Sequence, residues 1–280
     1  MTKLKIDAFI DPILNYINTN PDHQKYFDFT FKAQKYEPKL LLKMIGIVLK
    51  EGLGWRSIAT FYGDYEIFPK WQTVYAFYKK LINKRIILST YAQMLKKYYI
   101  KNKNEPLKYR FTDTSFIYSR NGGKNVKFNK YFGRKKCCKL SLITDANGIP
   151  YNIFVGNGNT NDCKILMQQI NTQNVVDIDT SNNFNYFMAD SGYDTKEVRN
   201  VLRSLKFIPL IPFNKRNTKD TKKINKMPKK DYSLYKKRIK IEHVFGTLKN
   251  NKKLLTRYEK LSEIFLNFIY IHFIKVLNTM

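Results

Sequence analysis

The sequence feature that most constrains the fold is a change of periodicity at Tyr109. Residues before it carry the apolar spacing of helices, whereas residues 109–119 are aromatic and β-branched, a composition typical of a strand. Two apolar runs, 137–145 and 149–157, then flank an Asn-Gly turn and predict a β-hairpin. Strand and helix signals alternate in the segments that follow. This order favours an α/β domain with a mixed sheet.

The remaining elements of this domain follow from caps and apolar runs. Asp145 lies at the hairpin turn, and we interpret it as a turn-forming residue rather than a catalytic one. We predict a helix at 159–170 capped by Asn159, Thr160 or Asn161, followed by a strand at 183–190. A helix at 191–205 begins with a capping box of Asp194 and Glu197. The last predicted elements are a strand at 207–212 and helices at 231–253 and 254–277.

Residues 1–105 predict a helical N-terminal region, with 97–110 as the linker to the α/β domain at 106–280. Short helices at 54–63 and 71–82 are consistent with a helix-turn-helix DNA-binding unit, and equally with a small helical bundle. Other helices are expected at 38–52 and 85–100. In the first interpretation the exposed face of the second short helix carries Gln72, Thr73, Tyr75 and Lys79, whereas in the second Trp71, Val74 and Phe77 cap the bundle.

The chain is strongly basic, with 51 Lys and Arg against 22 Asp and Glu and a net charge of +29. Such an excess makes a compact chain repel itself and indicates a polyanionic partner, either nucleic acid or an anionic membrane. Membrane insertion is disfavoured because no stretch reaches about 18 uncharged apolar residues. The most apolar segment, 264–278, is interrupted by Asn267, His272 and Lys275, which favours a core helix. We therefore expect a nucleic-acid partner and no membrane.

Cysteine and histidine are too few to build most catalytic sites. The three cysteines (Cys137, Cys138 and Cys163) show no metal-binding or disulfide spacing, which is typical of a reducing compartment. The chain has three histidines, so a zinc site or a Ser-His-Asp triad is hard to assemble. By elimination, the chemistry rests on carboxylates.

Three carboxylates are placed where they would converge. Asp113 lies inside the first strand, where burial is costly without a partner, and Asp190 ends the strand at 183–190. Glu242 lies on the helix at 231–253. If the two strands are neighbours, this helix can bring Glu242 to their edge. Three converging carboxylates repel one another, and two Mg²⁺ ions about 4 Å apart would resolve this repulsion.

The helix at 231–253 carries further polar groups beside Glu242. Tyr235, Arg238, Glu242 and Lys249 fall within an arc of about 60° on a helical wheel, next to an apolar stripe. A carboxylate can hold a divalent cation, while Arg and Lys can hold phosphate oxygens. The alternative is an amphipathic helix whose solvated face carries ordinary charge pairs.

Three motifs resemble those of a known family. FTDTS surrounds Asp113, MADSGYD surrounds Asp190, and Tyr235, Arg238, Glu242 and Lys249 satisfy the spacing Tyr-x2-Arg-x3-Glu-x6-Lys. The chain resembles the DDE transposases of bacterial insertion sequences, specifically the group with that last signature. The similarity extends over about 38–275 and includes KLSLITDANGIPYNIFVGNGNTND and TRYEK. The short interval between the second and third motifs leaves no room for the large β-rich insertion that some relatives carry.

The resemblance implies a ribonuclease H-like core with a mixed five-stranded sheet, and metal-dependent DNA cleavage and strand transfer. Asp113, Asp190 and Glu242 would bind two Mg²⁺, with Mn²⁺ able to substitute. The partner would be double-stranded DNA, both the terminal inverted repeats of the element and the target, bound by a homodimer or higher oligomer inside the cell. DNA contacts are expected from Tyr235, Arg238 and Lys249, from Arg134, Lys135 and Lys136, from Lys215 and Arg216 within the basic segment 213–230, and from Gln72, Thr73 and Lys79.

Two other functions are compatible with part of this evidence. A ribonuclease H-like nuclease would use the same carboxylates and metal ions to hydrolyse DNA without strand transfer. A domesticated DNA-binding protein would keep the fold without the chemistry. The intact set of Asp113, Asp190 and Glu242 speaks against the second alternative.

Overall fold

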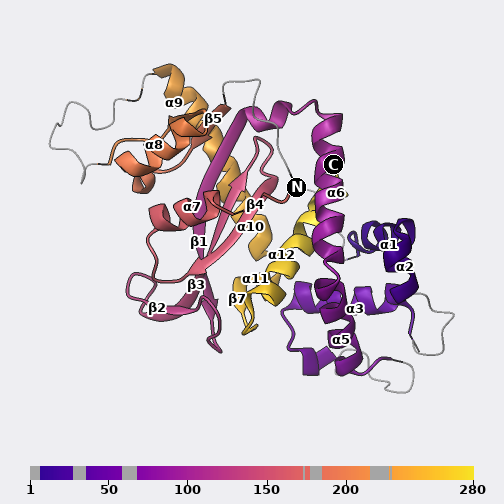
Figure 1. Cartoon of the computed structure of the whole chain (residues 1–280). Helices are drawn as coiled ribbons and strands as arrows, with labels where there is room; N and C mark the ends of the chain where they lie inside the picture. Colours follow the sequence, from indigo (N-terminus) through magenta and orange to yellow (C-terminus); the bar gives the residue numbers. More distant parts are fainter. Residues whose placement is uncertain are drawn as a thin grey trace. The chain divides into compact units, whose positions relative to one another are not determined.

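The computed structural model describes residues 7–27, 36–58, 68–172, 174–176, 185–214, 227 and 229–280 (Figure 1). These residues form two compact units. The first contains the described residues of Met1–Leu95, Tyr118–Lys124 and Leu248–Met280. The second contains those of Lys96–Ile117 and Asn125–Thr247. The N-terminal helices thus cluster with the C-terminal segment.

Helices build most of the first unit. Helix α3 begins with Pro38 in its first turn and ends at Gly52, whose φ of 69° is left-handed, as expected for a glycine that terminates a helix. The C-terminal helix α12 is buried, which confirms a core role, and the Tyr78 hydroxyl donates to the Ile264 carbonyl at 2.9 Å. The helices are α1 (Ile10–Thr19), α2 (Pro21–Phe27), α3 (Pro38–Glu51), η1 (Trp55–Ser57), α5 (Trp71–Asn83), α6 (Ile86–Lys101), which continues into the second unit, α11 (Lys252–Leu255) and α12 (Ser262–Leu277).

The described residues contain a mixed seven-stranded sheet in the order β2-β3-β1-β5-β6, with β4 paired to β3 and β7 paired to β1. A mixed α/β fold is therefore confirmed, whereas the expected number of five strands is wrong. The two additional strands, β2 and β7, are too short to produce a recognisable alternation in sequence. The strands are β1 (Tyr109–Ser119), β2 (Lys127–Asn129), β3 (Lys135–Thr144), β4 (Pro150–Asn157), β5 (Asn185–Met188), β6 (Phe207–Leu210) and β7 (Thr256–Arg257).

Strands β1 and β5 are parallel neighbours, which confirms the predicted adjacency. Phe111 pairs with Met188 in the register of the two strands. Asp113 and Asp190 each stand two residues beyond that pair, so the register carries both carboxylates toward the same edge of the sheet. The hairpin of β3 and β4 is also as predicted, and Asp145 forms its turn by accepting hydrogen bonds from the backbone N–H of Asn147 and Ile149, both at 2.9 Å.

The helices around the sheet include one correction to the expected caps. Asn161 caps α7 as predicted, since its side chain accepts from the backbone N–H of Cys163. The cap of α8 is Thr195, not Asp194, because the Asp194 carboxylate is engaged by the Arg199 side chain instead. The elements are η2 (Glu105–Lys108), α7 (Asp162–Ile170), η3 (Ser191–Tyr193) and α8 (Lys196–Ser204).

The helix expected at 231–253 is broken, contrary to prediction. It consists of α9 (Lys229–Tyr235), the 3₁₀ turn η4 (Lys236–Arg238) and α10 (Ile239–Lys249). A 3₁₀ turn has three residues per turn instead of 3.6, so the helical wheel drawn through Tyr235 and Glu242 does not hold across it. No Gly or Pro marks the break; the Arg238 side chain is drawn instead into a contact with the sheet.

The proposed helix-turn-helix falls partly outside the described residues. Of its first helix, predicted at 54–63, only residues 54–58 are described, and these include the 3₁₀ turn η1. On α5, Gln72, Thr73 and Lys79 are exposed. No helix in the described part of the chain is long and apolar enough to span a membrane.

Candidate active site

Asp113 lies near the middle of β1, and both of its carboxylate oxygens are engaged. Oδ1 accepts a hydrogen bond from the backbone N–H of Thr114 at 2.8 Å. Oδ2 lies 2.7 Å from Nη2 of Arg238. The Asp113 side chain is 22% exposed and that of Arg238 is 11% exposed, so this ion pair is largely shielded from water.

Arg238 also contacts Glu242. Its Nη1 lies 3.3 Å from Glu242 Oε1, one helical turn further along the chain. Because the Glu242 side chain is 53% exposed, this contact is screened and contributes little to stability. The guanidinium of Arg238 nevertheless bridges two of the three predicted catalytic carboxylates.

Asp190 follows the end of β5 and caps the short turn η3. Its Oδ1 accepts from the backbone N–H of Gly192 at 2.8 Å. A Cβ atom added to Gly192 would lie 2.9 Å from the same oxygen, so the glycine permits this close approach. The carboxylate is thus oriented by the chain that immediately follows it.

The electrostatics show that these groups act on one another. Burial raises the pKa of Asp113 to about 6; Arg238 and the Thr114 N–H oppose this shift, and the charges of Asp190 and Asp162 add to it. Burial also raises the pKa of Tyr235. The charge of Arg238 opposes this shift, and the charges of the three predicted catalytic carboxylates add to it. The Tyr235 phenol therefore lies close enough to these groups for their charges to act on it.

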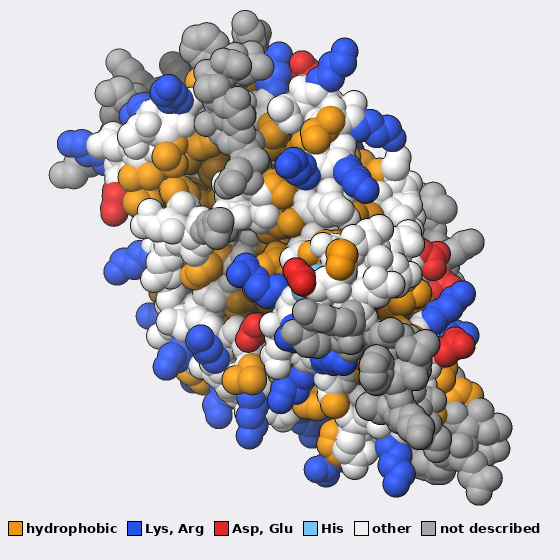
Figure 2. Space-filling view, turned by 45° about the vertical axis from the view of Figure 1, so that its right-hand side comes forward, with side chains coloured by type: hydrophobic (Ala, Val, Ile, Leu, Met, Phe, Trp, Pro, Cys, Tyr) orange, Lys and Arg blue, Asp and Glu red, His pale blue; other side chains and the backbone are white. Residues whose placement is uncertain are grey.

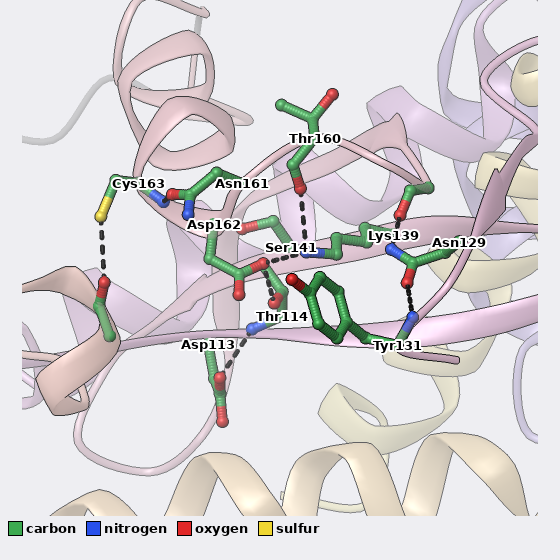
Figure 3. Close-up of polar contacts among 12 residues, drawn as sticks. Asp113, Thr114, Asn129, Tyr131, Lys139, Ser141, Thr160, Asn161, Asp162 and Cys163 are labelled. Carbon is green, nitrogen blue, oxygen red and sulfur yellow. Dashed lines mark hydrogen bonds and ion pairs between the residues drawn. The ribbon is translucent and has the colours of Figure 1, made fainter. Parts of the chain in front are cut away.

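Asp162 is a further carboxylate whose charge acts on Asp113 from the other side of β1 (Figure 3), and it was not among the predicted site residues. Figure 3 shows Asp113 and Thr114 projecting from β1 to opposite sides, with Thr114 directed toward Asp162. Oδ1 of Asp162 accepts from Thr114 Oγ1 and from Lys139 Nζ, both at 2.7 Å. Lys139 itself was the overlooked signal, because a lysine inside an apolar strand requires an acidic partner.

The donor set suits a divalent cation, but the present arrangement is not that of a closed chelate. Carboxylate oxygens are the ligands that Mg²⁺ and similar hard cations prefer. Within the described residues, however, no three His, Cys, Asp or Glu side chains form a group that could hold a metal ion. Arg238 supplies the positive charge between Asp113 and Glu242 instead.

The other predicted site residues are more scattered. Lys249 is half-buried at the end of α10, and Gln72, Thr73 and Lys79 belong to the first unit. Lys215 and Arg216 lie outside the described residues. Arg134, Lys135 and Lys136 are exposed where β3 begins.

The turn between β2 and β3 adds exposed aromatic side chains that sequence reasoning missed. Phe128 is exposed, and Tyr131 is 82% exposed. Asn129 fixes the turn, because its Oδ1 accepts from the backbone N–H of Tyr131 at 2.8 Å and its Nδ2 donates to the Gly158 carbonyl at 2.6 Å. Exposed basic and aromatic side chains therefore share this turn, and Lys130 Nζ lies 5.0 Å from the ring centroid of Tyr131.

Comparisons with known proteins bear on the whole of this region. A family model described as "Transposase DDE domain" matches residues 108–277. No curated protein matches the chain. Among solved structures, the catalytic domain of Mos1 mariner transposase is 11% identical, with a TM-score of 0.28, over 60% of this chain and 90% of that one. The Mos1 mariner paired-end complex with Mn is 10% identical, with a TM-score of 0.25, over 87% of each chain.

Proposed function

The chain belongs to the DDE transposase family, and we propose that it cleaves DNA strands at the ends of an insertion element and joins them to a target. The reacting site would consist of Asp113, Asp190 and Glu242 on a ribonuclease H-like core. The observation that carries the proposal is that Arg238 contacts both Asp113, which is far away in the sequence, and Glu242, while the charge of Asp190 acts on Asp113.

Asp113, Asp190 and Glu242 would hold two divalent cations, Mg²⁺ or Mn²⁺. When bound, such ions supply an activated water or 3′-hydroxyl and stabilise charge on the leaving oxygen. Asp113 and Asp190 are oriented for this role by backbone N–H groups, whereas Glu242 is on an exposed face of α10. Arg238 would release Asp113 and Glu242 and place its guanidinium on phosphate oxygens.

The DNA would be the double-stranded terminal inverted repeats of the element and the target, held by a homodimer or higher oligomer. Tyr235, Arg238 and Lys249 would contact the backbone near the cleaved bond. Arg134, Lys135 and Lys136 would add phosphate contacts beyond it. On the face shown in Figure 2, Lys and Arg side chains predominate over Asp and Glu, as a polyanionic partner requires.

The test is an assay with DNA of the element ends, Mg²⁺ and a target plasmid. Wild-type protein should give joined products. Asp113→Asn, Asp190→Asn and Glu242→Gln should each abolish cleavage and retain DNA binding. Glu197→Gln is the matched control, because Glu197 is an exposed acid on α8; its products should equal those of the wild type.

Three other results would contradict the proposal, each in a different way. Cleavage without joining would indicate the nuclease that hydrolyses DNA and does not transfer strands. Binding without any cleavage by the wild type would indicate a domesticated DNA-binding protein. Normal cleavage by any one of the three carboxylate variants would show that the assigned residue is not catalytic.

A further inference from the structure

Arg110 is a buried cation for which the described structure provides no anion. It lies on β1, three residues before Asp113, and therefore projects from the opposite side of the strand. It is 1% exposed, and its Nε and Nη2 atoms are buried without a hydrogen-bond partner. Removing a guanidinium from water without an acceptor is strongly unfavourable, so this position calls for a bound negative group.

Two aromatic rings flank the guanidinium but cannot satisfy it. Its central carbon lies 4.5 Å from the ring centroid of Phe207 and 5.5 Å from that of Tyr151. Cation–π contacts offset part of the cost of burying the charge, and they orient the plane of the guanidinium. The rings accept no hydrogen bond from the N–H groups that point outward in the plane of the guanidinium. Those N–H groups therefore stay available to an anion.

A cavity of about 230 Å³ adjoins Arg110. Tyr151, Phe207, Asn152 and Asn174 line it together with aliphatic side chains, and no Asp or Glu is among the described lining residues. Asn152 and Asn174 are linked by a 3.0 Å hydrogen bond from Asn152 Nδ2 to Asn174 Oδ1, which fixes one wall. The cavity has room for a phosphate or a small organic acid but not for a strand of DNA.

We propose that this cavity binds one small anion through a phosphate or carboxylate group held by Arg110. The proposal is independent of the transposase function, because Arg110 faces away from Asp113 and takes no part in the reaction. The bound anion would neutralise the buried guanidinium and stabilise the folded chain in proportion to its occupancy.

The test is the melting temperature of the full chain titrated with inorganic phosphate, and separately with acetate, at constant ionic strength set by chloride. At saturation the wild-type melting temperature should rise by roughly 3–5 °C with at least one of these anions. Phosphate also stabilises proteins without binding a site. The control for that effect is Arg203→Gln, which changes an exposed arginine on α8 and should keep the full response.

Two variants of Arg110 separate binding from folding. Arg110→Met removes the buried charge and should fold, with the saturable part of the response lost. Arg110→Lys keeps the charge and should retain a response at a higher anion concentration. The anion that gives the larger response, confirmed by isothermal titration calorimetry, identifies phosphate or carboxylate as the ligand group.

Two outcomes would overturn the proposal. One is an equal rise in melting temperature for the wild type and Arg110→Met, which would show a general salt effect. The other is a wild type that does not respond while the double variant Asp177→Asn/Asp179→Asn does. Those two residues lie outside the described part of the chain, and that result would assign the counter-ion to the chain itself.

Discussion

The guanidinium of Arg238 lies 2.7 Å from the carboxylate of Asp113, across 125 residues of sequence. The same guanidinium reaches Glu242, so one arginine neutralises two of the groups proposed to hold metal. A divalent cation and Arg238 would therefore compete for the same oxygens. Since a cation that replaces Arg238 also frees it, metal binding and the phosphate contact of Arg238 would be coupled.

The first prediction concerns this competition. In the absence of DNA, Arg238→Ala should bind Mg²⁺ about 3- to 10-fold more tightly than the wild type, because the competing charge is gone. Strand transfer by the same variant should fall by about tenfold or more, because a transition-state contact is lost. Isothermal titration calorimetry and the joining assay measure the two effects. Lys240→Ala is the control, because Lys240 is an exposed basic residue of α10, two residues after Arg238. If Arg238→Ala bound Mg²⁺ more weakly than the wild type, the proposed competition between Arg238 and the cation would be contradicted.

The second prediction concerns the turn that leads into β3. Replacing Arg134, Lys135 and Lys136 together by alanine should reduce the slope of log affinity against log salt by about three units, one for each lost phosphate contact. The control replaces three exposed lysines of α6, Lys96, Lys97 and Lys101, and so makes the same change in net charge. Salt titrations of DNA binding that give equal slopes for the two triple variants would exclude a specific contact.

The third prediction concerns the hydrogen bond between Thr114 and Asp162. Thr114→Val keeps the shape of the side chain but removes the 2.7 Å bond to the carboxylate, and should cost about 1–2 kcal/mol in the free energy of unfolding. Thr114→Ser keeps the hydroxyl and should lose less. Chemical denaturation would measure both variants. If Thr114→Val were as stable as the wild type while Thr114→Ser were destabilised, packing of the methyl group rather than the hydrogen bond would explain the contribution of Thr114.

The fourth prediction concerns pH and Asp145. This carboxyl is fully buried, and burial raises its pKa to about 6, above the value of about 3.9 in an unfolded chain. The folded state therefore binds the proton more tightly, and the contribution of Asp145 to stability falls as pH rises from about 4 to about 6.

Asp145→Asn keeps the oxygen that accepts from Asn147 and Ile149 but carries no charge. At pH 7 it should be more stable than the wild type by about 1–3 kcal/mol, and this difference should vanish near pH 4. Thermal unfolding of both proteins across this range is the measurement. If the difference in stability between the two proteins did not depend on pH, the Asp145 carboxyl would have the same charge in the folded and the unfolded state throughout this range.

Local signals in the sequence were sufficient for much of the sheet. The aromatic and β-branched composition of 109–119 predicted β1, and the Asn-Gly turn predicted the β3–β4 hairpin. The cap of α7 is Asn161, one of the three predicted candidates. Each of these depends on residues close together in the chain. The adjacency of β1 and β5 was also predicted, because an acidic residue inside one strand and another at the end of the second suggested a shared edge.

Features produced by contacts between distant residues were not predictable in the same way. The 3₁₀ turn before α10 has no Gly or Pro, and it accompanies the attraction of Arg238 to Asp113. Asp162 of α7 forms an ion pair with Lys139 of β3, and no local pattern identifies these two residues as partners. Strand β7 contains two residues, and its pairing with β1 leaves no signature in composition.

The parallel pairing of β1 with β5 has a consequence for the order of events during synthesis. The β3–β4 hairpin can form as soon as it emerges, and β1 can pair with β3, whereas the other edge of β1 waits for β5, which is encoded later. At about 5–20 residues per second, a ribosome needs roughly 6–25 s to pass from Asp113 to Arg238. A polypeptide that ends before that point carries neither Arg238 nor Glu242, so an interrupted translation product would lack one of the three residues proposed to hold metal and the arginine that bridges two of them.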